Sequence, residues 1–232
     1  MVSCIALIAG LVTCLLIALD IRKRPQHMRV MNVTWPITGL YMPVVGWLLY
    51  RILGRAPLPS SDHHHGHEAH HPGHEHHHAH HHANKPLWKS ALVDNTHCGG
   101  GCTIGDIVAG PIAAITAFSV AGSLLMGHFV ASFIAAFVFG IAFQYSPKRE
   151  MNPSMSRGKA LVEALKADTL SVICYQIGMY IWLLICVYGF NMHLDAFTLP
   201  YWFMMQIAML LGFITVYPAN LILIKTGIKE AM

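Results

Sequence analysis

Long apolar stretches separated by shorter polar segments dominate the chain. A transmembrane α-helix needs about 20 consecutive, mostly apolar residues, and six stretches approach that length. The pattern therefore predicts an all-α polytopic membrane protein with about six transmembrane helices. The predicted spans are Val2–Leu19, Val33–Leu53, Ile107–Met126, Phe129–Tyr145, Thr169–Phe190 and Tyr201–Ile224.

The polar segments between these spans carry three further predictions of local structure. Gly127 and His128 interrupt the apolar pattern, which predicts a tight hairpin between the third and fourth helices. Residues Ser156–Lys166 have the leucine and alanine spacing of an amphipathic helix, and we expect this helix to lie along the membrane surface. Asp168, directly before the fifth span, suits an N-terminal helix cap.

A histidine-rich tract interrupts the chain after the second span. Segments of this composition cannot bury a core, so we predict a disordered loop. It divides the chain into an N-terminal helix pair (residues 1–55), the loop (56–86) and a four-helix core (87–232). Neutral imidazoles coordinate transition-metal ions, and the candidate ligands are His63, His64, His65, His67, His70, His71, His74, His76, His77, His78, His80, His81 and His82.

The composition narrows the possible classes of protein. The chain is 55% hydrophobic and 11% charged, whereas about 25% of the residues in a soluble domain are charged. The net charge of +4 is modest and is carried mainly by loops, so it does not indicate a nucleic-acid partner. No segment has the length or motif of a nucleotide-binding domain, which excludes an ATP-driven pump.

Chemically active side chains gather in the segment Thr96–Asp106. Thiolates and imidazole select copper, zinc or an iron–sulfur cluster over magnesium or calcium. Glycine costs about 1 kcal/mol relative to alanine inside a helix, so the run Gly99–Gly101 predicts a loop or broken helix that folds the donors around one ion. The candidate metal ligands here are His97, Cys98, Cys102 and Asp106.

Other interpretations of this segment stay open. Cys98 and Cys102 could form a redox-active pair, or they could be inert thiols beside a structural helix break. Asp106 could cap the following helix through its carboxylate. If the segment winds as a helix instead, four residues spaced by four share one face, namely Asp94, Cys98, Cys102 and Asp106.

Several motifs recur in one order through the last two thirds of the chain. The motif His97-Cys98-x-x-Gly101-Cys102-x-x-Gly105-Asp106 is followed by Lys166–Ser171, by Gly178-Met179-Tyr180-x-Trp182 and by the segment from Tyr201 to Asn220. This combination, from about Lys85 to Met232, resembles a family of bacterial integral-membrane proteins known as a domain of unknown function. The resemblance implies a shared helical membrane core and no particular activity, and it does not extend to the first two helices or the histidine tract.

The distribution of Lys and Arg does not decide the topology by itself. The six-span arrangement places 11 positive residues on the side of the histidine tract and four on the other, and an arrangement in which Leu87–Asp106 crosses the membrane gives the same division. Because Leu87–Asp106 is rich in polar residues and glycine, we predict that it does not cross. The tract and both termini are then cytoplasmic, in the inner membrane of a bacterium.

These features together predict a protein that binds and transports a transition-metal ion, with copper first and zinc or nickel next. The flexible tract would capture the ion and pass it to His97, Cys98 and Cys102. We expect a non-enzymatic protein with membrane lipid, a metal ion, and a membrane-protein partner or second copy as its partners, and no nucleic acid. The alternatives are a membrane thiol–disulfide oxidoreductase and a non-catalytic assembly subunit of a membrane complex.

Overall fold

A computed structural model describes residues 1–58 and 86–229. The histidine tract and its predicted disorder therefore lie outside the described residues. Within the described ranges the structure contains helices and no strand, which confirms the all-α fold. The elements are α1 (Val2–Lys23), α2 (Met31–Tyr41), α3 (Pro43–Leu49) with the π-helical turn η1 (Tyr50–Gly54), α4 (Leu87–Ile115), α5 (Leu124–Met151), α6 (Arg157–Leu184) with the π-helical turn η2 (Ile185–Gly189), and α7 (Leu199–Lys225).

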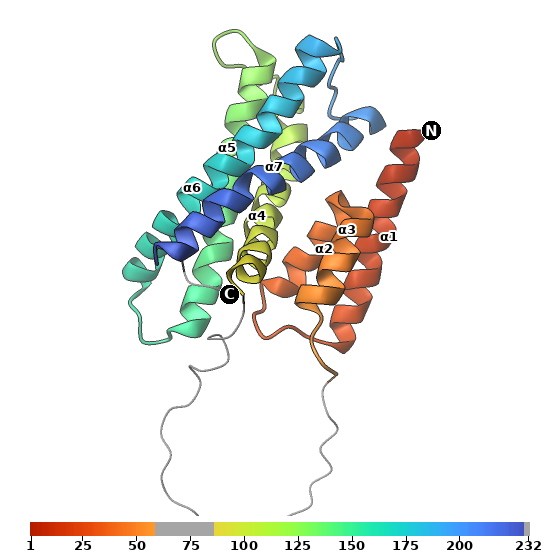
Figure 1. Cartoon of the computed structure of the whole chain (residues 1–232). Helices are drawn as coiled ribbons and strands as arrows, with labels where there is room; N and C mark the ends of the chain where they lie inside the picture. Colours follow the sequence, from red (N-terminus) through yellow and green to blue (C-terminus); the bar gives the residue numbers. More distant parts are fainter. Residues whose placement is uncertain (59–85, 230–232) are drawn as a thin grey trace, which may run out of the picture.

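Five helices in the described part of the chain are long and apolar enough to cross a membrane: α1, α4, α5, α6 with η2, and α7. The chain is thus a membrane protein. The helices α4 to α7 form an antiparallel bundle, and α1 to α3 pack beside it (Figure 1). In the most apolar 18-residue stretch of each helix, 61% of the residues of α4 are buried, against 11% of those of α1. The helix with the most polar residues therefore lies at the centre of the molecule.

The third transmembrane helix begins 20 residues earlier than the apolar pattern predicts, at Leu87 instead of Ile107. It ends at Ile115, and the predicted hairpin at Gly127 and His128 is wrong because both residues lie in the first turns of α5. The reversal occurs upstream, where residues 117, 121 and 122 have positive φ values of 48°, 51° and 76°. The Ser123 side chain then caps α5 by accepting a hydrogen bond from the Met126 N–H at 3.3 Å.

The predicted loop or broken helix at Gly99–Gly101 is wrong, because α4 runs through these residues without interruption. In a membrane each unpaired backbone group costs several kcal/mol, which exceeds the helix penalty of about 1 kcal/mol for each glycine. The glycines instead allow close helix contacts. A Cβ on Gly101 would lie 2.9 Å from the Gly140 Cα of α5, and one on Gly105 would lie 2.6 Å from the Ala136 Cα.

The basic segment before the fifth span is part of a transmembrane helix. Ser156 caps α6 by accepting a hydrogen bond from the Lys159 N–H at 3.3 Å, and the helix then continues to Leu184. The prediction of a separate surface helix over Ser156–Lys166 is therefore wrong. The leucine and alanine spacing of this segment belongs to the first turns of α6, which are buried on one side only. Periodicity alone cannot distinguish such turns from a helix on the membrane surface.

The predicted second span is a helical hairpin that enters the bundle and returns. The chain reverses at Met42 and Pro43, and a Cβ on Gly46 of α3 would lie 2.9 Å from the Thr38 carbonyl oxygen of α2. Its far end comes back to the end of α1, where the Asp20 carboxylate accepts hydrogen bonds from Tyr50 at 2.8 Å and from Arg55 at 3.0 Å. The hairpin therefore begins and ends on the same side of the molecule.

The two termini lie at opposite ends of the bundle (Figure 1). Gln206, in the second turn of α7, donates hydrogen bonds to the carbonyl of Leu40 at the hairpin tip and, at 3.5 Å, to that of Ala6. The start of α1 is therefore beside the start of α7, and α7 ends at the other side of the molecule. The start of α1 and the end of α7 thus lie at opposite ends of the bundle, and the described part of the chain contains five candidate spans, whereas the six-span prediction places both termini on one side.

Candidate functional site

One face of α4 carries polar and reactive side chains through the middle of the bundle. Because the segment is helical, residues spaced by four lie above one another. Asp94, Cys98, Cys102 and Asp106 are all buried, with exposed fractions of 0 to 1%. The structure therefore contains the helical alternative for this segment, in which the four residues share one face of α4.

The two thiols lie within an apolar cluster. Cys98 is 1% exposed and Cys102 is 0% exposed, and both are free. Buried aromatic and thioether side chains of α6 and α7 belong to the same cluster, among them Tyr175, Met179 and Met205. Neither thiol can be reached by solvent or by a partner protein in this arrangement.

Asp168 faces the thiols from the neighbouring helix. It lies well inside α6, whose N-cap is Ser156, so the predicted capping role is wrong. The carboxylate faces Cys98 and contacts the position of a Cβ on Gly140 in α5. It is 0% exposed, and neither of its oxygen atoms has a hydrogen-bond partner within the described structure.

Asp106 is a second carboxylate in the interior. It lies within α4, so it does not cap a helix, and it faces Ser132 of α5 and Gln176 of α6. Neither oxygen atom has a hydrogen-bond partner in the described part of the chain. Buried carboxylates are costly when they are unpaired, so Asp106 and Asp168 both stand in positions where a cation would be stabilised.

His97 lies on a different face of α4 from the cysteines. Its ring is in edge-to-face contact with Phe143 of α5, with 6.3 Å between the ring centroids, and neither nitrogen has a partner among the described residues. Adjacent helical residues differ by about 100° around the axis, so His97 cannot follow Cys98 to a shared point. The structure does not bring His97, Cys98 and Cys102 together, and no three His, Cys, Asp or Glu side chains of the described residues could hold one metal ion.

Lys229, which no pattern in the sequence identified as a site residue, completes the site at the end of the bundle where α7 terminates. The Lys229 ammonium lies 2.6 Å from an Asp94 carboxylate oxygen, and both side chains are buried. It also donates to Asn220 at 3.3 Å and to Ser171 at 3.4 Å. The Asn220 amide in turn donates to Asn95 at 2.6 Å. This network joins α4, α6 and α7 to the segment after α7.

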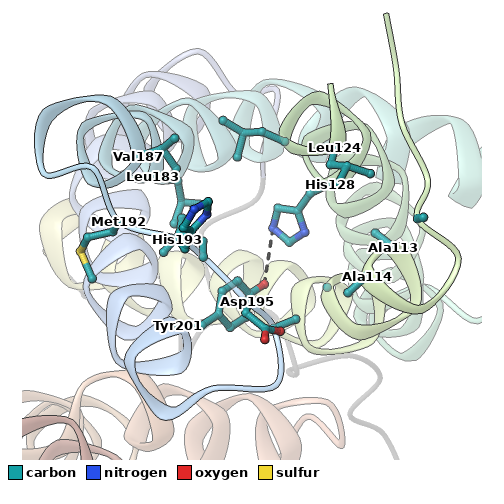
Figure 2. Close-up of a pocket in the computed structure, with 15 residues that line it drawn as sticks. Ala113, Ala114, Leu124, His128, Leu183, Val187, Met192, His193, Asp195 and Tyr201 are labelled. Carbon is teal, nitrogen blue, oxygen red and sulfur yellow. Dashed lines mark hydrogen bonds between the residues drawn. The ribbon is translucent and has the colours of Figure 1, made fainter. Parts of the chain in front are cut away.

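A cavity of about 380 Å³ opens at the other end of the bundle. His128 and Tyr201 lie on its wall, with 3.5 Å between the imidazole Nε2 and the phenol oxygen, and His193 and Asp195 also line it (Figure 2). Gly110 of α4 also lines the cavity. The pattern of the sequence did not single out this group, because its members come from three separate segments.

Together these groups form a polar column along α4, which we define as Lys229, Asp94, Cys98, Asp168, Cys102 and Asp106. It begins at the ion pair and leads toward the cavity at Gly110. With a rise of about 1.5 Å per residue, the 16 steps from Asp94 to Gly110 cover about 24 Å, most of the apolar thickness of a membrane. The tract ligands His63–His82 lie outside the described residues.

The comparisons with known proteins give a family and no activity. The family model described as a domain of unknown function (DUF4396) matches residues 87–229, which include α4 to α7, the polar column and Lys229. No curated protein and no solved structure matches the chain. The matched range covers more than half of the 232 residues. The chain therefore belongs to the family of the domain of unknown function DUF4396.

Proposed function

We propose that this protein transports a cation through the interior of its four-helix core, and that the cargo is a soft or borderline transition-metal ion, copper first and zinc or nickel next. The observation that carries the proposal is the polar column along α4, in which two buried carboxylates have no hydrogen-bond partner among the described residues and lie beside two buried thiols. Ionisable residues inside a membrane bundle are costly and mark the pathways of ions or protons.

The charges in the column favour a positive cargo. Three carboxylates, Asp94, Asp106 and Asp168, are buried along it, against the single ammonium of Lys229. Asp94 is paired with that ammonium, while Asp106 and Asp168 have no hydrogen-bond partner within residues 1–58 and 86–229. A cation that moved along α4 would supply the missing partner at each of these positions in turn.

The thiols favour a soft metal ion over sodium or calcium. Thiolates and thioethers select copper(I) and zinc over hard cations, and the cluster around Cys98 and Cys102 also contains Met179, Met205 and Met209. The donors are distributed along the helix instead of converging on one point. Conduction requires several sites that bind weakly enough to release the ion, and a series of sites with few donors each meets that requirement.

The orientation we propose places the histidine tract in the cytoplasm. The 14 Lys and Arg residues in the described part of the chain belong to segments that emerge at the end of the bundle where α7 terminates, or to the helical turns next to it. The loops 116–123 and 190–198 at the other end contain none. Positive residues accumulate on the cytoplasmic side, so the tract could supply ions to the end of the column at Asp94, in the plasma membrane of a bacterium.

The burial of the thiols is the reason for ranking transport above a thiol–disulfide oxidoreductase. A redox-active pair must be reached by its electron acceptor, and Cys98 and Cys102 are 1% and 0% exposed. An assembly subunit without transport activity would not require unpaired carboxylates at the centre of the bundle.

The experiment is metal uptake into vesicles that contain the purified protein, with Cu⁺, Zn²⁺ and Ni²⁺ each offered alone. We expect the variants Cys98→Ser/Cys102→Ser and Asp106→Asn to lower uptake about tenfold or more, since a loss of about 1.4 kcal/mol of binding is already a factor of ten. Cys4→Ser, an exposed thiol of α1, is the matched control and should behave as the wild type. If no metal ion enters with the wild-type protein, or if the core variants transport normally, the proposal is wrong.

A further inference from the structure

Lys229 enters the bundle from a short segment after α7. The helix ends at Lys225, the chain turns at Gly227 with a φ of 71°, and the N–H groups of Ile228 and Lys229 both donate to the Leu223 carbonyl at 3.1 Å. The side chain then points back between the helices and is only 2% exposed. A lysine at the end of a transmembrane helix would normally extend into water, as exposed Lys225 does.

The surroundings of the ammonium are those of a cation site. Its three partners are oxygen atoms from three different helices: a carboxylate oxygen of Asp94, the amide oxygen of Asn220 and the hydroxyl of Ser171. Asn220 is itself held in this orientation, because its amide group donates to Asn95. Oxygen donors arranged in this way bind cations of many kinds, and Lys229 fills the position.

The charge on Lys229 is stable in this position. Burial lowers the pKa of its ammonium, but the carboxylates of Asp94 and Asp168 raise it by more, so that the pKa lies above its ordinary value. The lysine is therefore protonated at neutral pH and acts as a permanent positive charge.

We propose that Lys229 is a tethered cation that closes the cytoplasmic end of the transport path by occupying the site that the incoming metal ion must take. This inference rests on the proposed function and adds the gate to it. Asp94 lies one helical turn before Cys98, so an ion that displaces the ammonium from Asp94 reaches the thiols and Asp168 next. Gly227, with its positive φ of 71°, provides the hinge for withdrawal, since no atom of the described residues lies within 4 Å of a Cβ built there.

The first test measures access to the column directly. In a protein that retains Cys98 as its only cysteine, the rate of alkylation by a small, charged, membrane-impermeant maleimide added on the cytoplasmic side reports whether the path is closed. We expect slow alkylation with native Lys229 and with Lys229→Arg, and alkylation about tenfold faster or more with Lys229→Met, which keeps the length of the side chain without its charge. Lys225→Met is the matched control and should leave the rate unchanged.

The second test distinguishes a gate from a simple anchor. Zn²⁺ alone should protect Cys98 from alkylation in Lys229→Met at concentrations that have no effect on the protein with native Lys229, because the vacated site at Asp94 then accepts the ion. If the lysine only anchors the chain end, Zn²⁺ will protect both proteins equally, and the inference is wrong.

Loss of the ammonium leaves Asp94 buried without a partner, so Lys229→Met could fail to fold. The double variant Asp94→Asn/Lys229→Met removes both charges, and we expect fast alkylation of Cys98 that Zn²⁺ does not prevent. Slow alkylation in the folded double variant would overturn the gate. Absence of metal uptake by the wild-type protein, in contrast, would overturn the proposed function whatever the alkylation rates are, so the two failures are distinguishable.

Discussion

The contact between α4 and α5 offers a test of whether the segment around the cysteines is a packed helix. We consider Gly105→Ala, which adds one methyl group. Its Cβ would lie 2.6 Å from the Cα of Ala136, whereas carbon atoms in contact are about 3.5 to 4.0 Å apart. The neighbouring atom belongs to a backbone and cannot rotate away, so the two helices must separate by about 1 Å.

The expected loss of stability is that of an overpacked core, about 1 to 3 kcal/mol. In a protein of this size that corresponds to a fall of about 2 to 12 °C in the thermal midpoint. The assay is thermal unfolding of the detergent-solubilised protein, followed by loss of the monodisperse peak in size-exclusion chromatography. Gly101→Ala should act in the same direction, since its Cβ would lie 2.9 Å from the Gly140 Cα.

Gly158→Ala is the matched control. It lies in the first turn of α6, and nothing is within 4 Å of a Cβ at this position. The same methyl group should there leave the midpoint unchanged or raise it slightly, because alanine is the better helix former by up to about 1 kcal/mol. If Gly105→Ala were as stable as Gly158→Ala, α4 would not pack on α5 in this register, and the segment would be the loop that its glycines suggest.

Three further predictions concern the hairpin, the topology and the ion pair. Asp20→Ala removes the hydrogen-bond acceptor of Tyr50 and Arg55. Because the ion pair of Asp20 with Arg55 is partly exposed to solvent, we expect a loss of stability of only about 1 kcal/mol, measured by thermal unfolding. An unchanged midpoint would show that these bonds do not hold the hairpin. Single cysteines at Ser119 and Ser154, in a protein without native cysteines, should differ in intact cells, with rapid labelling of Ser119→Cys by an impermeant thiol reagent and none of Ser154→Cys; the reverse pattern would place the histidine tract outside. The raised pKa of Lys229 means that its stabilising contribution is fully present below the unfolded pKa of about 10.4 and is lost only as the pH rises through the higher folded value. The difference in thermal midpoint between wild type and Lys229→Met should therefore not decrease between about pH 7 and pH 9, and a decrease within that range would contradict the assignment.

The spans near the C-terminus could be predicted from the sequence because nothing in them conflicts with the apolar pattern. The predicted spans Thr169–Phe190 and Tyr201–Ile224 correspond closely to the end of α6 with η2 and to α7. The hairpin of α2 and α3 was mistaken for a span because its total length is that of one transmembrane helix. The return of the chain becomes visible in the contact of Gly46 with Thr38 and in the contact of the far end with Asp20.

The residues of the candidate site could be predicted only in part from the sequence. The interval of four residues correctly predicts the buried face of α4 that carries Asp94, Cys98, Cys102 and Asp106. The glycines predicted a break in the helix, because glycine has a low helix propensity in water. Asp168 looked like a cap because it stands beside the apolar run, and its position well inside α6 depends on where that helix begins. Lys229 could not be found at all, since its partners lie 9 to 135 residues away in the chain.

The position of the positive residues has a consequence for how copies of this protein can associate. With every described Lys and Arg at or near one end of the bundle and none in the loops 116–123 and 190–198 at the other end, insertion in the opposite direction is strongly disfavoured, and we expect all molecules in a membrane to share one orientation. Any symmetric assembly must then have its rotation axis along the membrane normal. Such an assembly would bring the ends of η1 and the starts of α4, which flank the histidine tract, to a single face in all subunits. Under the proposed function, the tracts would then supply metal ions as one common reservoir.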